Sequence, residues 1–317
     1  MSRSGSTLLS HRIQNSTQEV LVLPESKTLE ILYILGNKYL GSSTPEKILE
    51  HIENDPRWQN LEINRNILLN ALSALPILSI QSVFEAIIQY KLNEVSSPIK
   101  YVLLKNGHIM DHIPSVLKLF PQSYFLHIHR DPRGVISSML KAKSPFFSGK
   151  RFAHRNARML SKYYAKYRSQ FHTIDSSDKM EVSYEALCNH ERETLDGIAE
   201  WLNVGLSTNT SSPLISEAEK EIHALVDKDI RIPRLHAWKT ELKESDGVVV
   251  ESILPEYIDR PFFNSNPIYK AAILFFQMIQ EFFIKLWLPL KSTFKHIRSG
   301  QYAILWRKIF RLKPLIT

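Results

Sequence analysis

Cysteine is almost absent from this sequence of 317 residues, in which Cys188 is the only one. A single thiol cannot form an internal disulfide, so nothing in the sequence requires an oxidising compartment. The first residues lack the apolar core of a signal peptide. No apolar run reaches the roughly 18–20 residues that a membrane-spanning helix needs. No Cys and His cluster has the spacing of metal ligands. We therefore expect a cytoplasmic protein that holds no metal.

Acidic residues are scarce near the C-terminus. Residues 264–317 contain six Lys and three Arg against one Glu, so this tail alone has a net charge of +8. The whole chain also has a net charge of +8, which leaves residues 1–263 close to neutral. Because a nucleic-acid-binding protein concentrates its positive charge on its folded face, we expect no nucleic-acid partner. The 44% hydrophobic and 23% charged residues are typical of a soluble globular protein.

The lysine of a Walker A loop is also missing. That motif needs G-x-x-x-x-G-K-[ST], whereas only four residues precede Gly5, and Ser6 stands where the lysine would be. A metal-dependent nucleotidase is therefore disfavoured. Arg3, Ser4, Gly5, Ser6 and Thr7 still form a polar turn that runs into an apolar helical pattern. Such a turn offers backbone N–H groups and the positive end of the helix dipole to a phosphate or sulfate. The alternative is a flexible N-terminus that happens to hold Ser and Gly.

Short apolar runs alternate with helical patterns in the first 202 residues. The expected strands are 19–23, 99–104, 124–128 and 179–182, and the expected helices lie within 27–93, 111–119, 133–141, 151–171 and 191–202. This alternation predicts an α/β fold of three layers, P-loop-like, with a central parallel sheet covered by helices. Ligands bind such sheets beyond the carboxyl ends of the strands. We expect one domain over 1–263, with a helical insert at 27–93, and a helical tail over 264–317.

The most informative block is residues 125–138, in which an apolar strand leads to Arg130. Asp131 can cap the following helix, and Pro132 suits its first turn. An arginine at the end of a strand, beside the start of a helix, is well placed to bind a phosphate. Ser138 lies two helical turns further on and can add a hydroxyl. The alternative is a surface arginine paired with Asp131 and a serine that faces solvent.

Taken together, these motifs resemble the sulfotransferase family. Residues 3–9 look like its 5′-phosphosulfate loop, and residues 129–133 with Ser138 look like its 3′-phosphate motif. Residues 104–108 and 119–121 are similar to its Lys-x-Pro…Phe-Pro region, and residues 182–187 match its Tyr-Glu-x-Leu segment. The resemblance covers roughly residues 1–243. It is closest to the group that includes bacterial and Golgi glycan and tyrosine sulfotransferases.

The resemblance implies 3′-phosphoadenosine 5′-phosphosulfate (PAPS) as the donor, and transfer of its sulfuryl group to a hydroxyl or amine. The acceptor is a glycan, a lipid or a small molecule. Residues 4–7 would hold the 5′ end of the donor, with Arg3 nearest the transferred group. Arg130 and Ser138 would hold the 3′-phosphate, and Tyr184 is a further residue of the donor pocket. The scheme requires no metal.

The resemblance also implies a general base. Glu25 matches the glutamate of the glycan and tyrosine branches, and His108 is the rival, as in the cytosolic branch. A carboxylate that merely stabilises a helix N-terminus is the alternative for Glu25. Lys105 is a structural or a substrate-site cation. His127 and His129 alternate with apolar residues in a strand, and we expect them to be packing or sheet-end residues.

Two departures from the family stand out. The strand that leads into the family's loop is missing in front of Arg3, and Gly107 replaces the usual proline. We therefore hypothesise that the chain continues upstream or that this copy is impaired. The alternative function is a truncated or inactive sulfotransferase-fold protein that binds nucleotide without turnover. A P-loop phosphotransferase is disfavoured by the absent lysine.

The tail has two apolar patterns. Residues 268–286 repeat apolar side chains at helical spacing, and residues 291–313 mix aromatic and aliphatic residues with seven basic ones. The second pattern favours a helix lying on an anionic membrane surface over residues 291–317. Docking on the sheet domain and a contact between subunits are the alternatives.

Overall fold

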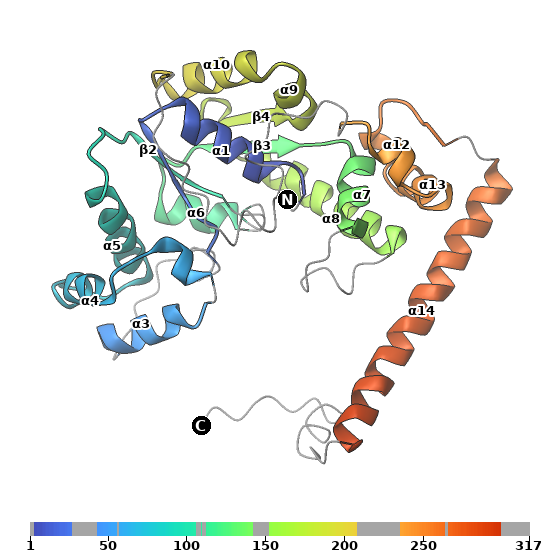
Figure 1. Ribbon diagram of the computed structural model, residues 1–317, viewed down its shortest axis with the longest axis horizontal. Coiled ribbons are helices and arrows are strands. Elements are labelled where there is room, and N and C mark those ends of the chain that lie inside the picture. The colour runs from blue at the N-terminus through green and yellow to red at the C-terminus, as the bar shows by residue number, and fades with distance from the viewer. Residues whose placement is uncertain are drawn as a thin grey trace.

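The computed structural model describes residues 3–26, 43–55, 57–105, 109, 112–141, 152–207, 235–263 and 266–298. The strands are β1 (Val20–Leu23), β2 (Tyr101–Leu104), β3 (Phe125–His129) and β4 (Lys179–Ser183). The helices are α1 (Ser6–Ser16), α3 (Pro45–Glu53), α4 (Arg65–Ser73), α5 (Ile80–Asn93), α6 (Ile113–Leu119), α7 (Pro132–Lys141), α8 (Ala153–Phe171), α9 (Tyr184–Asn189), α10 (Glu191–Leu202), α12 (Trp238–Glu241), α13 (Glu244–Ile253) and α14 (Pro267–Arg298). Short 3-10 helices span Trp58–Leu61, Ser176–Asp178 and Pro255–Tyr257. Figure 1 shows the arrangement of the helices and strands.

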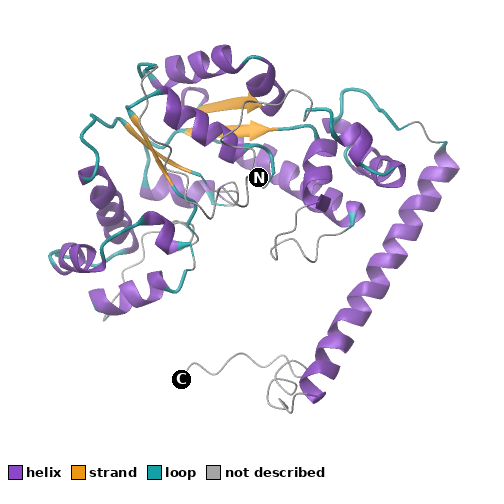
Figure 2. Ribbon diagram, in the orientation of Figure 1, coloured by secondary structure: helices purple, strands orange, loops and turns teal. Residues whose placement is uncertain are grey.

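The four strands pair in parallel, as the sequence predicts. β1 pairs with β2, with Val20 opposite Tyr101, and β3 pairs with β4, with Phe125 opposite Lys179 (Figure 2). The structure differs from the expected single central sheet. Over the described residues the strands form two separate sheets of two strands each. The edges of β2 and β3 that would join the two sheets are not paired with each other.

The first core packs α3, α4 and α5 against β1. Its buried residues include Leu21, Leu23, Ile48, Leu49, Ile52, Leu61, Leu68, Leu72, Val83, Phe84 and Ile87. Thr44 caps α3 by accepting a hydrogen bond from the Lys47 backbone, with Pro45 in the first turn. Ser79 and Ser82 form a capping box at the start of α5. The described part of the helical insert therefore packs directly on the first sheet. Residues 27–42 of that insert lie outside the described residues.

A second core joins the two sheets. Its buried residues come from α1, β1, β3, β4, α9 and α10, and they include Leu9, Ile13, Val20, Ile128, Val182, Leu187, Ile198 and Leu202. Because α1 contributes to this core, the residues that precede it are held beside the ends of the strands. The sheets thus position the N-terminal turn.

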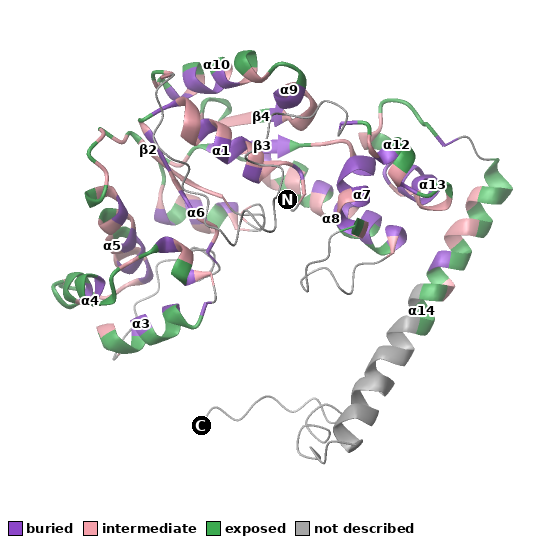
Figure 3. Ribbon diagram, in the orientation of Figure 1, coloured by how far each residue is buried: buried purple, intermediate pink, exposed green. Residues whose placement is uncertain are grey.

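The C-terminal segment packs on α7 and α8 through a buried ion pair. Arg133 donates from Nη1 to Glu251 Oε1 at 2.8 Å and from Nη2 to Asp131 Oδ2 at 2.8 Å. Its guanidinium also lies 3.9 Å from the ring centre of Trp238. Val249, Val250 and Leu254 fill the core below it. In Figure 3 much of α7 and the middle of α13 are coloured as buried.

The last helix, α14, projects away from the body, as Figure 1 shows. It is one helix of 32 residues that continues through Pro289. It contacts α8 and α13, and Phe275, Phe282 and Phe283 remain exposed. Within the part of the chain that the structure describes, no helix is both long and apolar enough to cross a bilayer.

Candidate functional site

The N-terminal turn has the backbone of a glycine-dependent loop. Arg3 and Gly5 both have left-handed conformations, with φ of 69° and 103°. Gly5 is the N-cap of α1, and its carbonyl accepts a hydrogen bond from the Leu9 backbone at 3.0 Å. Ser4 is fully buried, and Ser6 is the first residue of the helix. The predicted polar turn at the start of a helix is therefore present, with the dipole of α1 behind it.

Tyr184, the first residue of α9, explains why position 5 is glycine. A Cβ atom at Gly5 would lie 2.3 Å from Tyr184 Cδ2 and 2.9 Å from Cε2. The ring therefore occupies the space that any other side chain would need. The loop and Tyr184, which are 179 positions apart in the sequence, form one packed unit. Burial is the main cause that raises the pKa of Tyr184 to about 12, so its hydroxyl stays protonated at neutral pH.

Arg130 lies over the same ring from the end of β3. Its Cζ is 4.1 Å from the ring centre of Tyr184, and its Nη1 donates to the Arg3 carbonyl at 3.4 Å. A Cβ at Gly134 would lie 3.0 Å from Arg130 Nε. Gly134 in the first turn of α7 therefore lets the guanidinium lie close to the start of that helix. Sequence reasoning missed this role of Gly134, although a glycine just after Asp131-Pro132-Arg133 could have indicated a close approach.

Arg3 completes a pair of neighbouring cations. Its Nε donates to Ser138 Oγ at 3.0 Å. Burial, followed by the positive charge of Arg130, lowers the pKa of Arg3. Among the described residues neither guanidinium forms an ion pair with a carboxylate. An anion placed here would relieve the repulsion of two like charges and receive charge-assisted hydrogen bonds.

Asp131 does not neutralise Arg130. It caps α7 by accepting from the Arg133 backbone at 2.8 Å, as predicted, and its carboxylate binds the Arg133 side chain. Although burial lowers the pKa of Arg133, the hydrogen bonds and charges of Asp131 and Glu251 outweigh this effect and raise it. The surface pair of Arg130 with Asp131, which the sequence left open, is not formed.

A third cation, Lys105, stands on the other side of the loop at the end of β2. Its Nζ is 3.3 Å from Thr7 Oγ1 and 3.8 Å from Glu25 Oε2. The other oxygen of Glu25 accepts from Arg57 Nη1 at 2.7 Å. The structure thus places Glu25 next to the loop, between Lys105 and Arg57. Arg57 is a second residue that the sequence did not single out, because it lies 32 positions away and in no motif.

Of the two histidines of β3, His127 is a packing residue and His129 a sheet-end residue, as expected. His127 is 6% exposed and its ring stacks on Tyr167, with 3.9 Å between the ring centres. Burial lowers the pKa of His127, which favours the neutral imidazole. His129 is exposed at the end of the strand. His108, the rival base, lies outside the described residues, as do Asn106 and Gly107.

Three cations, the N-terminus of α1 and two hydroxyl groups therefore lie at the loop. The cations are Arg3, Arg130 and Lys105, and the hydroxyls are those of Thr7 and Ser138. Arg3, Arg130 and Ser138 lie on one side of it, and Lys105 with Glu25 on the other. Arg3 and Arg130, beside a helix N-terminus, suit an anionic ligand. Over the described ranges no group of three His, Cys, Asp or Glu residues could hold a metal ion.

The fold and the site define an α/β protein with a glycine-containing loop and neighbouring cations at the start of a helix. A family model described as the sulfotransferase family matches residues 1–208, and the chain belongs to that family. Its structure is similar to the sulfotransferase domain of the olefin synthase from Synechococcus PCC 7002, with a TM-score of 0.51 and 15% identity, covering 86% of this chain and 90% of that one. At this identity the likeness shows the fold alone.

A second solved structure is the sulfotransferase domain from the curacin biosynthetic pathway. Its TM-score is 0.44 at 17% identity, covering 86% of this chain and 93% of that one. No curated protein sequence matches the chain. The family match ends at residue 208, so α12, α13 and α14 lie beyond it.

Proposed function

We propose that this chain transfers the sulfuryl group of PAPS to a hydroxyl or amine of a glycan, lipid or small-molecule acceptor. The observation that supports this most is the pair Arg3 and Arg130, two adjacent guanidiniums without a carboxylate partner in the described part of the chain. They lie between the start of α1 and the start of α7, where helix dipoles favour anions. Family membership supplies the reaction class.

The residues of the site fit the donor. PAPS supplies an activated sulfuryl group and carries anionic groups on both the 5′ and the 3′ side of its ribose. The turn at Ser4, Gly5, Ser6 and Thr7 would hold the 5′ group through the backbone N–H groups at the start of α1. Arg130 and Ser138 would hold the 3′-phosphate, and Tyr184 would fix Arg130 in place.

Glu25 is the proposed general base. Arg57 donates a hydrogen bond to Oε1 of Glu25. The other carboxylate oxygen, Oε2, lies 3.8 Å from Lys105 Nζ. Glu25 would take the proton of the acceptor hydroxyl as the new O–S bond forms and the S–O bond to the 5′-phosphate breaks. Arg3 and Lys105 would stabilise the negative charge that develops on the oxygens. The product on the donor side is adenosine 3′,5′-bisphosphate.

Transfer of radiolabelled sulfate from PAPS to a panel of acceptors tests the proposal. Arg3→Ala should lower the rate about 100-fold or more, because a charge-stabilising group is removed. Arg192→Ala is the matched control, since Arg192 pairs with Asp196 on the exposed side of α10. No transfer to any acceptor, together with tight nucleotide binding, would favour the second candidate.

That second candidate is a protein that binds nucleotide without turnover. The unpaired edges of β2 and β3 support it, because both strands end beside the loop and give it less than a full sheet as a base. A loop is positioned accurately only when rigid elements hold it. Glu25→Gln distinguishes the two candidates, since it should slow transfer about 100-fold in an enzyme and leave nucleotide binding unchanged in both cases. Glu53→Gln is its control, because Glu53 also pairs with an arginine, Arg65, far from the loop.

A further inference from the structure

The helix α14 docks on the body of the protein through a narrow row of residues. Gln277 is buried there: its side chain accepts a hydrogen bond from the His154 backbone at 3.0 Å and donates one to Asp246 Oδ1 at 3.0 Å. Ile273 and Leu274 beside it are partly buried against the core that α7, α8 and α13 share. Positions 273, 274 and 277 therefore form the docked side of the helix.

The larger apolar residues of α14 lie on its other side and are exposed. They are Ile268, Phe275, Phe276, Met278, Phe282 and Phe283, between 50% and 81% exposed. In a helix of about 3.6 residues per turn, their average direction is about 170° from that of the docked positions. An amphipathic helix of a globular protein normally turns its apolar face to the core. The helix α14 does the reverse, and we call this side its outward face.

The outward face is large for a single helix. The ring centres of Phe282 and Phe283 are 6.0 Å apart, and Phe275 and Phe276 lie seven positions earlier on the same side. Because one phenylalanine has about 150–250 Å² of surface, the four rings alone expose roughly 400–600 Å². The largest apolar patch of a typical monomer is about 300–600 Å² and is often functional. Since α14 also projects away from the body (Figure 1), its outward face has the character of an interaction surface.

The charge of this part of the sequence indicates what the face contacts. Residues 264–317 contain nine basic residues and one acidic residue. Within α14, Lys291, Lys295 and Arg298 each follow an apolar residue by one position, so in the helical repeat the basic row flanks an apolar row. Basic residues beside an apolar row suit a helix at a lipid surface, where long cationic side chains reach the headgroups while aromatic residues enter the acyl boundary.

We propose that α14 lies along an anionic lipid surface, with its outward face at the boundary between headgroups and acyl chains. The body of the protein stays on the aqueous side, because positions 273, 274 and 277 dock it on the opposite side of the helix. Anionic headgroups neutralise the basic residues. A second copy of the chain would instead bring an equal positive charge to the contact, which disfavours a dimer through this face.

Co-sedimentation of the full chain with vesicles tests the proposal. We expect binding to phosphatidylcholine vesicles that contain phosphatidylserine and little binding to pure phosphatidylcholine. The binding should weaken as salt rises, because ions screen the attraction. The double variant Phe275→Ser with Phe282→Ser should lower the partition onto the anionic vesicles about tenfold or more, since it removes two rings from the acyl boundary.

Two further double variants serve as checks. Ile67→Ser with Ile77→Ser is the matched control, because these exposed apolar residues lie in α4 and between α4 and α5, and it should bind like wild type. Phe276→Ser with Phe283→Ser changes the other two rings of the outward face and should repeat the loss. Thermal unfolding of each variant shows that it is folded, since all the replaced side chains are exposed.

Three results would overturn the proposal. One is the absence of binding to the phosphatidylserine vesicles, and another is equal binding by wild type and both phenylalanine variants, which would mean that charge alone holds the chain. The third is a dimer in sedimentation velocity without lipid that the phenylalanine variants abolish, because a second copy would then cover the face. None of these readouts needs PAPS or an acceptor, so the outcome is independent of the proposed sulfuryl transfer.

Discussion

Gly5→Ala perturbs the loop at its most constrained point. The backbone at Gly5 has φ of 103°, a conformation that L side chains rarely adopt. Holding alanine there costs about 1–3 kcal/mol. The new Cβ would also lie 2.3 Å from Tyr184 Cδ2, so the ring must move, and overpacking of this kind costs about 1–3 kcal/mol. We therefore expect the free energy of unfolding to fall by about 2–6 kcal/mol if the loop keeps its form.

The two contributions can be separated by removing the ring. Tyr184→Ala in the Gly5→Ala background removes the clash and leaves the backbone strain. A double-mutant cycle should therefore show a coupling of about 1–3 kcal/mol. Urea unfolding followed by tryptophan fluorescence gives all four free energies, since the chain has five Trp residues. Affinity for adenosine 3′,5′-bisphosphate should fall about tenfold or more in Gly5→Ala, because Arg130 rests on the same ring.

Gly197→Ala is the control for this prediction. Gly197 lies within α10, and a Cβ there would meet only Met180 Cε, at 3.7 Å. The change should be neutral or stabilising, because alanine favours helix more than glycine does. A Gly5→Ala protein as stable as wild type, or a cycle without coupling, would refute the packing of Tyr184 against the loop.

Two further predictions concern residues outside the loop. Arg133→Met should cost about 3–5 kcal/mol in urea unfolding, because it leaves the buried carboxylate of Glu251 without its cationic partner. Adding Glu251→Leu should recover part of this loss, and a double variant that is less stable than the single one would contradict it. Burial lowers the pKa of His127 below its ordinary 6.5, so the unfolded chain takes up a proton that the folded chain does not. Stability should therefore be lost as pH falls below about 6.5, and His127→Gln should reduce the slope of stability against pH in that range. An unchanged slope in this variant would place the titrating group elsewhere.

Local sequence signals predicted the elements well. The expected helices at 133–141 and 191–202 correspond to α7 (Pro132–Lys141) and α10 (Glu191–Leu202), since apolar periodicity marks both and Asp131 also caps the first. The site residues Gly5, Arg130 and Tyr184 also lie together. Their motifs follow strands or precede helices, and parallel strands bring such positions to one edge.

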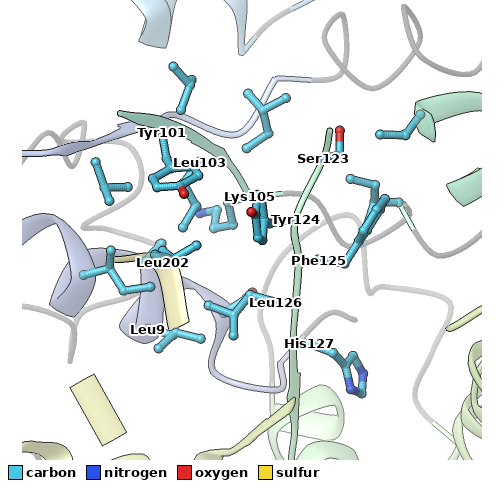
Figure 4. Close-up of a pocket in the computed structure, with 18 of the residues that line it drawn as sticks. Leu9, Tyr101, Leu103, Lys105, Ser123, Tyr124, Phe125, Leu126, His127 and Leu202 are labelled. Atoms are coloured by element: carbon cyan, nitrogen blue, oxygen red, sulfur yellow. The ribbon is translucent and has the colours of Figure 1, made fainter. Parts of the chain in front are cut away.

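Contacts between distant residues could not be predicted in this way. Whether Asp131 pairs with Arg130 or Arg133 depends on Glu251, which is 118 positions from Arg133 and draws that guanidinium into the core. The need for glycine at position 134 likewise follows from the side chain of Arg130. A single sheet was expected because the sequence pattern identifies each strand separately and does not show which strands pair. Its division into two sheets follows from the space between β2 and β3, which no strand of the described chain fills (Figure 4).

The central claim is that Arg130 recognises the 3′-phosphate of the donor. Isothermal titration of adenosine 3′,5′-bisphosphate against adenosine 5′-phosphate tests it most directly. One charge-assisted hydrogen-bonded contact supplies about 1.5–3 kcal/mol, so wild type should bind the bisphosphate about 10–100-fold more tightly. Arg130→Ala should abolish that preference and leave the affinity for adenosine 5′-phosphate almost unchanged. Equal affinity of the wild-type chain for both nucleotides would contradict the account.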